Sequence, residues 1–272
     1  MNAAVEAPPA PPAFEVFDLD AARAAIAAGQ PVVFPGVSFV RSQIHGRPML
    51  FVTDMENDPI QRGQREGRFY EGLELELIKR VFPFGGTFVD IGANVGNHGL
   101  YAAAFLQAGR VIPFEPNPRA YRLLIANVLA NGLEQRFDLS QLGCGLSDRM
   151  AAGFAMEKKG RNLGSARMIE GGGAITTRRG DAALEGITPD FIKIDVEGME
   201  MAVLRGLEGL FARCAPAMLI EVDDRNAADF AEWLAASGYR IEARHRRYRG
   251  EENFLLSRTP ARQPAARGPA EA

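Results

Sequence analysis

The chain has 272 residues, of which 47% are hydrophobic and 24% charged, as is typical of globular proteins. No apolar run reaches the ~18 residues that a membrane-spanning helix needs, so we expect no membrane span. The net charge of −3 gives no general attraction to nucleic acid, because proteins that bind duplexes usually carry a basic surface. We therefore expect no nucleic-acid partner.

The two ends of the chain are rich in alanine and proline. Residues 1–13 and 259–272 hold too few large apolar side chains to offset the entropy of ordering, so we expect both tails to be disordered. The first tail lacks the basic start and apolar core of a secretory signal, which favours a cytoplasmic location. Cys144 and Cys214 fit neither a disulfide framework nor a metal-ligand spacing, and we expect them to be small buried apolar residues.

A small N-terminal appendage is predicted over residues 14–70. Within it, Asp20 is a candidate cap for an alanine-rich helix that Gly29 ends, and the pattern then becomes extended. Residues 71–81 carry apolar side chains at helical spacing, which predicts an amphipathic helix. The main domain is predicted over residues 71–258.

Apolar strands alternate with helices from residue 87 onward, which predicts an α/β domain with a mostly parallel sheet and helices on both faces. The predicted strands span residues 87–91, 110–115, 137–143, 191–195 and 217–222. The predicted helices span residues 97–107, 118–131, 199–211 and 225–237. Two short antiparallel strands are expected over 239–242 and 253–256, and an insertion of short strands and glycine-rich turns over 150–185.

The segment DIGANVG, residues 90–96, lies between the first of these strands and its helix. Its glycines permit a tight turn and the close approach of a ligand at the carboxyl end of the strand, which is the usual ligand site of an open α/β sheet. A dinucleotide-binding loop has the pattern G-x-G-x-x-G, whereas this loop has G-x-N-x-G. A nicotinamide-dependent oxidoreductase is therefore the less favoured alternative.

S-adenosylmethionine fits this loop better because it has no phosphate group. It presents a carboxylate to backbone N–H groups, an ammonium to an acid, and two ribose hydroxyls to a second acid. Glu115 ends the second strand, where its carboxylate can accept both hydroxyls, and Asp90 can serve the methionine end, directly or through the loop. The alternative is structural: the glycines only pack helix against sheet, and Glu115 is a solvated strand end.

Three longer motifs make this pattern more specific. The runs FVDIGANVGNHGLYAA (88–103), FEPNPRAYRLLIANVLANG (114–132) and FIKIDVEGMEMAVLRG (191–206) resemble successive motifs of the FkbM methyltransferase family. The segment NLGS (162–165) is similar to a short element of that family, and the likeness covers roughly residues 70–225. One departure is Gly99, where a small hydroxylated residue is expected, which puts one contact to cofactor or substrate in doubt.

The resemblance implies a Rossmann-like class I methyltransferase fold with a seven-stranded sheet and S-adenosylmethionine as methyl donor. It also implies O-methylation of a hydroxyl on a sugar, glycan or secondary metabolite, so a small-molecule or glycan acceptor is the expected partner. The residues expected to bind the cofactor are Asp90, Gly92, Asn94, Gly96, Asn97, Glu115 and Asn117. A catalytically silent protein of the same fold, used as a binding module, is the alternative from another functional class.

Removal of the proton of a hydroxyl acceptor needs a base or a metal. Asp195 and Glu197 leave the fourth predicted strand at the ligand-binding edge of the sheet, which makes them catalytic candidates. The alternative is a structural ion pair of Asp195 or Glu197 with Lys193, because Lys193 would be costly to bury alone. His98 is a third candidate, because a helix N-terminus disfavours the imidazolium and leaves the ring able to accept a proton.

Two further groups of charged residues are ambiguous. Glu221 and Asp223 share a face at the end of the fifth strand and could join Asp195 in a magnesium site, but strand-end carboxylates without metal are favoured, and the metal stays unknown. The basic stretch at 244–249 fits an exposed strand or turn better than an anion site. Acceptor specificity is expected to come from the appendage and the 150–185 insertion, which carry no transferable motif.

Overall fold

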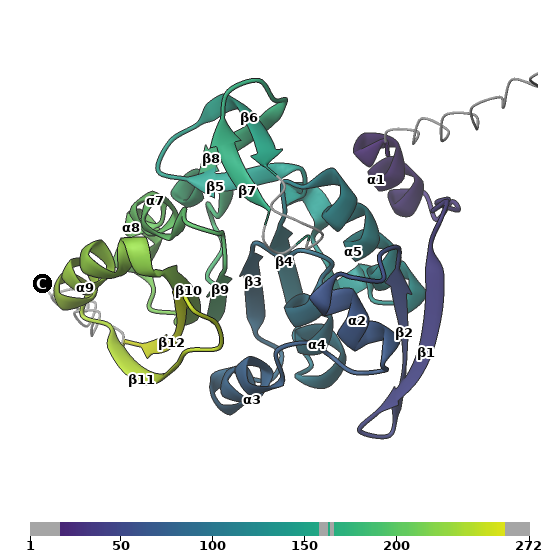
Figure 1. Cartoon of the computed structure of the whole chain (residues 1–272), viewed down its shortest axis with the longest axis horizontal. Helices are drawn as coiled ribbons and strands as arrows, with labels where there is room; N and C mark the ends of the chain where they lie inside the picture. Colours follow the sequence, from purple (N-terminus) through teal and green to yellow (C-terminus); the bar gives the residue numbers. More distant parts are fainter. Residues whose placement is uncertain (1–16, 158–162, 164–165, 259–272) are drawn as a thin grey trace, which may run out of the picture. The chain divides into compact units, whose positions relative to one another are not determined.

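The computed structural model describes residues 17–157, 163 and 166–258 (Figure 1). Both predicted tails lie outside these residues, as does the NLGS element apart from Leu163. The chain forms two compact units, Met1–Val32 and Val33–Ala272. In the first unit, α1 (Leu19–Ala27) is capped by Asp18 rather than by the predicted Asp20, because the Asp18 carboxylate accepts a hydrogen bond from the Ala21 N–H.

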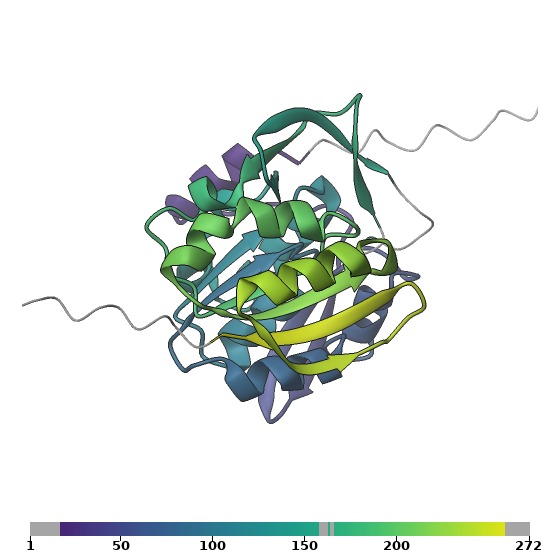
Figure 2. The ribbon, with the colours of Figure 1, turned by 90° about the vertical axis from the view of Figure 1, so that its left-hand side faces the viewer.

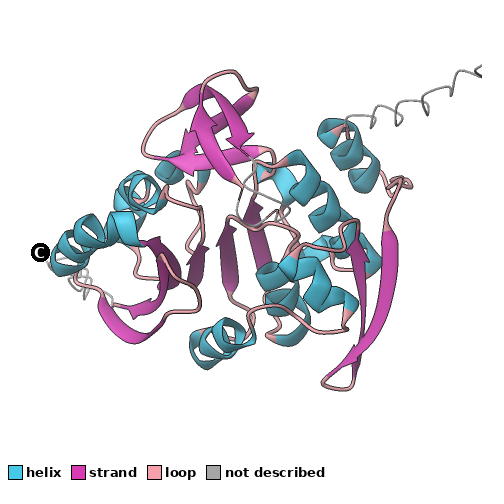
Figure 3. Ribbon diagram, in the orientation of Figure 1, coloured by secondary structure: helices cyan, strands magenta, loops and turns pink. Residues whose placement is uncertain are grey.

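Within the described part of the chain, the second unit is built around a mixed sheet of six strands in the order β11-β12-β10-β9-β3-β4 (Figure 3). The strands are β3 (Thr87–Ile91), β4 (Arg110–Phe114), β9 (Phe191–Ile194), β10 (Ala217–Asp223), β11 (Arg240–His245) and β12 (Glu251–Ser257). Strands β4, β3, β9 and β10 run parallel, whereas β12 is antiparallel to β10 and β11 is antiparallel to β12. The carboxyl ends of the four parallel strands therefore meet at one edge of the sheet.

The described residues do not form the seventh strand that the family resemblance implied, and the strand predicted over 137–143 is wrong. Phe137 makes a single parallel bridge with Val111, and the chain then enters the 3-10 helix η2 (Leu139–Gln141). The Asp138 carboxylate accepts a hydrogen bond from the Ser140 N–H. This local hydrogen bond stabilises a turn, which competes with the backbone hydrogen bonds of a strand.

Helices cover both faces of the central sheet (Figure 2). On one face, α7 (Glu200–Gly206), α8 (Glu208–Arg213) and α9 (Ala227–Ser237) share one apolar core with β3, β4, β9, β10 and β12. On the other face, Phe82, which ends α3 (Gly72–Val81), contacts the stacked rings of Phe88 and Phe191. Helix α4 (Asn97–Phe105) lies on this second face, where its Gly99 packs against Val111. Burial of both faces explains the nearly continuous apolar runs of the parallel strands.

Two smaller β structures complete the second unit. The predicted insertion contributes to a separate sheet in the order β5-β8-β6-β7, made of β5 (Cys144–Ser147), β6 (Ala151–Glu157), β7 (Arg167–Glu170) and β8 (Ile175–Arg179), followed by α6 (Gly180–Ala183). A hairpin of β1 (Ser38–Ile44) and β2 (Arg47–Thr53) precedes α2 (Pro59–Arg65). Strand β2 is fastened to α5 (Pro118–Ala130), because the Asn127 side chain forms hydrogen bonds with both backbone groups of Val52.

Every helix in the ranges described above is too short or too polar to cross a bilayer.

Candidate active site

The loop between β3 and α4 depends on its glycines. Gly92 has φ +80, and a Cβ placed there would lie 1.7 Å from the Asp195 carbonyl oxygen. Gly96 has φ +89 and begins α4 in the left-handed region, against Leu124. The N–H groups of Gly92 and Ala93 both donate to the Phe114 carbonyl. The loop is thus held between the ends of β4 and β9, where a side chain at residue 92 has no space.

Glu115 lies immediately after β4, with both carboxylate oxygens engaged by backbone. Its Oε2 accepts from the Asn94 N–H and its Oε1 from the Asn117 N–H, each at 2.8 Å. Burial raises the pKa of Glu115 to about 7, although these two backbone hydrogen bonds favour the ionised form. Asn117 itself caps α5, where its Oδ1 accepts from the Arg119 N–H. Glu115 and Asn94 line the same cavity, whereas Asn117 contacts Glu115 through its backbone N–H and does not line that cavity.

A buried lysine joins the ends of β3 and β9. Lys193 Nζ lies 3.1 Å from Asp195 Oδ2 and 3.6 Å from Asp90 Oδ1, and donates to the Gly92 carbonyl oxygen at 2.8 Å. Burial lowers the pKa of Lys193, but the carboxylates of Asp195 and Asp90 outweigh it and raise the net value, so the ammonium persists. Asp90 also accepts from the Gly99 N–H. The Lys193–Asp195 ion pair, which was the structural alternative for Asp195, is therefore present, and Asp90 contacts Lys193 and the start of α4.

The start of α4 fixes the segment that precedes α3. The Asn97 side chain bonds both the N–H and the carbonyl of Tyr70, each at 3.0 Å, so its amide is used for structure. The next residue along, Glu71, is held at φ +58, an uncommon conformation for a residue other than glycine. Its Oε2 lies 3.3 Å from His98 Nε2. A carboxyl group that the sequence did not predict therefore lies directly beside His98, one of the predicted catalytic residues.

Three carboxylates from the ends of β9 and β10 converge. Asp195, Glu197 and Glu221 each offer an oxygen within 4.8 Å of the other two. Burial, followed by the charge of Asp195, raises the pKa of Glu197 to about 8 and that of Glu221 to about 10. Asp223, which was only a possible partner of Glu221 in a magnesium site, is instead held by Arg225 and Arg167, and hydrogen bonding from Arg225 lowers its pKa to about 2. Asp195 and Glu221 therefore do lie together, but the third carboxylate of the group is Glu197 rather than Asp223.

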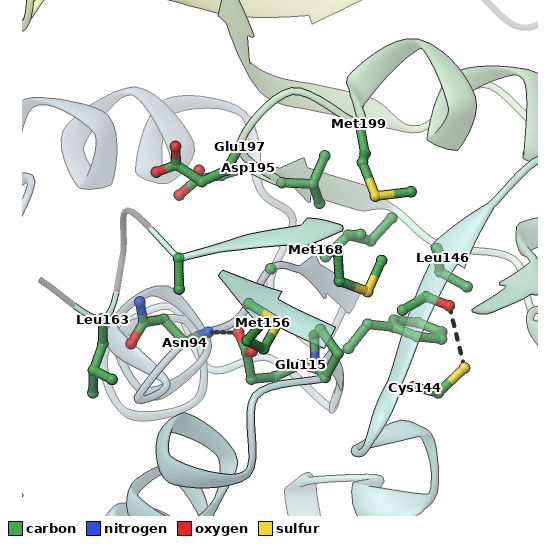
Figure 4. A pocket seen from close by; sticks show the side chains of 17 residues that line it. Asn94, Glu115, Cys144, Leu146, Met156, Leu163, Met168, Asp195, Glu197 and Met199 are labelled. Carbon is green, nitrogen blue, oxygen red and sulfur yellow. Dashed lines mark hydrogen bonds between the residues drawn. The ribbon is translucent and has the colours of Figure 1, made fainter. Parts of the chain in front are cut away.

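Two adjoining cavities share Gly92, Asn94, Asp195 and Glu197. The smaller, about 60 Å³, is lined by Glu115 and by apolar side chains, among them Leu146, Met156, Leu163, Met168 and Met199 (Figure 4). Figure 4 shows Asp195 and Glu197 on the side opposite Leu146 and Cys144. The larger cavity, about 290 Å³, is lined by polar groups that include Tyr70, Glu71, His98, Lys193, Glu221, Tyr248 and Glu251. The smaller cavity is mostly apolar, with the carboxylates of Glu115, Asp195 and Glu197 in its wall, and the larger is polar and mostly acidic.

The basic stretch at 244–249 does not form an anion site in the described structure. It occupies the end of β11 and the following turn, as expected. Arg246 pairs with Asp224 and Glu252, and Arg247 pairs with Glu71 and Glu74. These contacts neutralise much of the stretch locally, and Arg247 also stacks over the Tyr70 ring at 4.9 Å.

Several residues at the site carried no signal in the sequence. Glu71 precedes an ordinary amphipathic helix, and only its contact with His98 distinguishes it. Arg167 comes from the β6–β7 hairpin and reaches across to Asp223 at 3.0 Å and to Glu197 at 3.8 Å. Met156 and Met168 lie on the same hairpin, whose position over the cavity could not be inferred without the tertiary structure.

Residues 90–248 match the model of one protein family, the methyltransferase FkbM domain. Similar solved structures include a methyltransferase FkbM from Methylobacillus flagellatus KT, with 20% identity and a TM-score of 0.48, covering 64% of this chain and 44% of that one. Sp1610 from Streptococcus pneumoniae in complex with S-adenosyl-L-methionine has 18% identity, a TM-score of 0.45 and coverages of 71% and 76%. Ribosomal protein L11 methylase from Lactobacillus delbrueckii subsp. bulgaricus has 15% identity, a TM-score of 0.43 and coverages of 69% and 77%. The chain thus spans less than half of the Methylobacillus protein. No curated protein matches the sequence.

Proposed function

The chain belongs to the methyltransferase FkbM family, and from this we propose that it is an S-adenosylmethionine-dependent methyltransferase acting on a hydroxyl of a small molecule or glycan. The observation that carries the proposal is the Glu115 carboxylate, buried beside the glycine loop at the carboxyl end of β4. Each of its oxygens accepts one backbone N–H and keeps a lone pair for a second donor. Two neighbouring ribose hydroxyls match these two acceptors.

The residues around Glu115 fit the rest of the cofactor. The smaller cavity offers apolar and methionine side chains to a flat base, since a thioether is polarisable and adapts to aromatic surfaces. On the other side, the glycine loop, Asp90 and Lys193 carry the charges and backbone groups suited to an amino acid end. When bound, S-adenosylmethionine supplies an activated methyl group. In this proposal, Gly92, Asn94, Gly96 and Asn97 shape the loop, and Asn117 orders Glu115.

The larger cavity is proposed to hold the acceptor. Asp195 and Glu197 line both cavities, so they stand where donor and acceptor meet. Carboxylates accept hydrogen bonds from hydroxyls and repel phosphates, which favours a sugar-like acceptor over a nucleic acid. Asp195 is already paired with Lys193. We therefore propose that the main role of Asp195 and Glu197 is to orient the acceptor hydroxyl.

Methyl transfer is tested with donor labelled in the methyl group and a deproteinised bacterial extract of glycans and metabolites. The proposal predicts label in an extract component and formation of S-adenosylhomocysteine in proportion. Protein that binds the donor yet labels nothing would be a silent binding module instead. Label recovered in nucleic acid rather than in sugars or metabolites would contradict the acceptor class.

A further inference from the structure

The carboxyl group of Glu71 faces the proposed acceptor cavity and lies against His98. Glu71 Oε2 is 3.3 Å from His98 Nε2, and both residues line the 290 Å³ cavity together with Asp195 and Glu197. The Glu71 side chain is 15% exposed and that of His98 is 6% exposed. Glu71 is therefore the more accessible of the two, with the imidazole more deeply buried.

The pair is held in place by backbone contacts that involve neither reacting group. The Asn97 amide fixes both backbone groups of Tyr70, directly before Glu71, and Asn97 also directly precedes His98. Glu71 is in addition held at φ +58, so its side chain leaves the backbone from a strained position that the surrounding contacts must maintain. The contact between Asn97 and Tyr70 thus brings together the carboxyl group of Glu71, directly before α3, and the ring of His98, in α4.

The charges around the pair differ from those around Asp195. The Asp195 carboxylate lies 3.1 Å from the Lys193 ammonium, so one of its oxygens is engaged in an ion pair. Arg247 lies 3.7 Å from the other oxygen, Oε1, and the charges of Lys193 and Glu74 also act on Glu71. Burial, followed by the charge of Asp195, raises the pKa of Glu71 to about 8. Burial, followed by the charges of Lys193 and Arg247, holds the pKa of His98 well below its usual value, so the ring stays neutral.

We propose that Glu71 is the general base for the acceptor hydroxyl and that His98 is its positioning partner, which accepts a hydrogen bond from the carboxyl once Glu71 is protonated. The acceptor O–H bond breaks and its proton passes to Glu71 Oε2. The freed oxygen electron pair forms the new O–C bond with the methyl carbon, and the electrons of the C–S bond leave with the sulfur. This inference rests on the proposed function, and it assigns a residue that the family motifs do not include.

A neutral imidazole suits this arrangement. Within the described residues, His98 Nε2 makes no hydrogen bond, so in the tautomer that carries its proton on Nδ1 the Nε2 lone pair is open to the proton that Glu71 acquires. A base with a pKa close to the working pH combines a useful ionised fraction with a strong tendency to take the proton. Glu71 meets both conditions near neutral pH. Once Glu71 is protonated, the buried His98 ring is the neighbouring group that accepts a hydrogen bond from it.

The test uses full-length protein, labelled donor and the same extract, over a range of pH. The wild-type rate should rise with pH and level off above about 8, because Glu71 must be ionised to act. Glu71→Gln should lose about 10²–10⁴-fold of the rate, and Glu71→Asp should recover part of it. Glu76→Gln, on an exposed position of the same helix α3, is the matched control and should keep the wild-type rate and profile.

A second measurement does not depend on turnover. In the complex with S-adenosylhomocysteine, the NMR signals of the His98 ring should report a titration step near pH 8, and Glu71→Gln should remove that step. A wild-type ring that senses no such step, or a Glu71→Gln variant that transfers methyl groups at the wild-type rate, overturns the inference. If instead Asp195→Asn abolishes transfer while Glu71→Gln does not, Asp195 is the base. Wild-type protein that labels nothing overturns the proposed function itself, which is a distinguishable result.

Discussion

At the scale of single residues, the site depends on groups whose surroundings set their properties. Gly92 has no space for a side chain, Glu115 is buried with two backbone donors, and Lys193 links two carboxylates. The sequence predicted Gly92 and Glu115 because a glycine loop and a strand-end acid have fixed places in this kind of fold. It did not predict Glu71, because a carboxylate before a helix has no distinctive neighbours in the sequence. Contact with His98 exists only after folding.

Gly92→Ala should abolish S-adenosylmethionine binding and lower the thermal midpoint. The added Cβ would meet the Asp195 carbonyl oxygen, and neither backbone segment can yield without moving the loop. Gly132→Ala is the matched control, since Gly132 also has a positive φ of +62 but nothing within 4 Å of its would-be Cβ. The control should lose only the ~1 kcal/mol of backbone strain. Wild-type affinity in Gly92→Ala would show that the loop is not the cofactor site.

Cofactor affinity should increase as the pH rises through about 7, the raised pKa of Glu115. Only the ionised carboxylate accepts both ribose hydroxyls, so below this pKa each pH unit should weaken binding by up to about tenfold. Glu115→Gln cannot titrate and should lack this component of the pH dependence. Binding measured by calorimetry at several pH values checks it, and identical profiles for the two proteins would refute the role of Glu115.

At the scale of elements, the parallel strands were predicted well because their apolar runs are buried on both faces. Four predicted strands correspond to β3, β4, β9 and β10, and the closing antiparallel pair corresponds to β11 and β12. The strand over 137–143 failed because the Asp138 side chain favours a turn, a local competition that an apolar pattern does not reveal. The 150–185 insertion was predicted as short strands that set acceptor specificity, but not as the wall of the proposed cofactor cavity.

The β6–β7 hairpin should control cofactor exchange. It places Met156 and Met168 in the wall of the proposed cofactor cavity, so a displacement of the hairpin opens that cavity. Arg167 ties this hairpin to Asp223 and Glu197. Arg167→Ala should release S-adenosylhomocysteine about tenfold faster, as expected for loss of a charged hydrogen bond of ~1.5 kcal/mol.

The control for this prediction is Arg149→Ala. Arg149 is 62% exposed, pairs with Glu170 of β7 at 3.7 Å and does not line either cavity, so its loss should leave the release rate unchanged. Stopped-flow displacement of a fluorescent cofactor analogue measures both variants. Equal release rates for wild type and Arg167→Ala would mean that the hairpin is not held by this contact.

At the scale of the whole molecule, four parallel strands deliver their carboxyl ends to one edge, and every proposed site residue lies at or beside that edge. The strand order β10-β9-β3-β4 places the glycine loop, Glu115 and the acidic group next to one another, although they are spread over residues 90–221 of the sequence. The alternation of strands and helices predicted this edge. The sequence did not predict the division into an apolar and an acidic cavity, since that depends on the second sheet and on the segment before α3.

The most direct test of this account is a calorimetric titration of S-adenosylmethionine into wild-type protein and into Glu115→Ala, with NAD as the competing ligand. We predict one S-adenosylmethionine site in the wild type and no NAD binding. Glu115→Ala should weaken S-adenosylmethionine by ~2–3 kcal/mol, whereas Glu185→Ala, at an exposed position, should bind as the wild type does. Binding of NAD in place of S-adenosylmethionine, or wild-type affinity in Glu115→Ala with its thermal midpoint preserved, would contradict it.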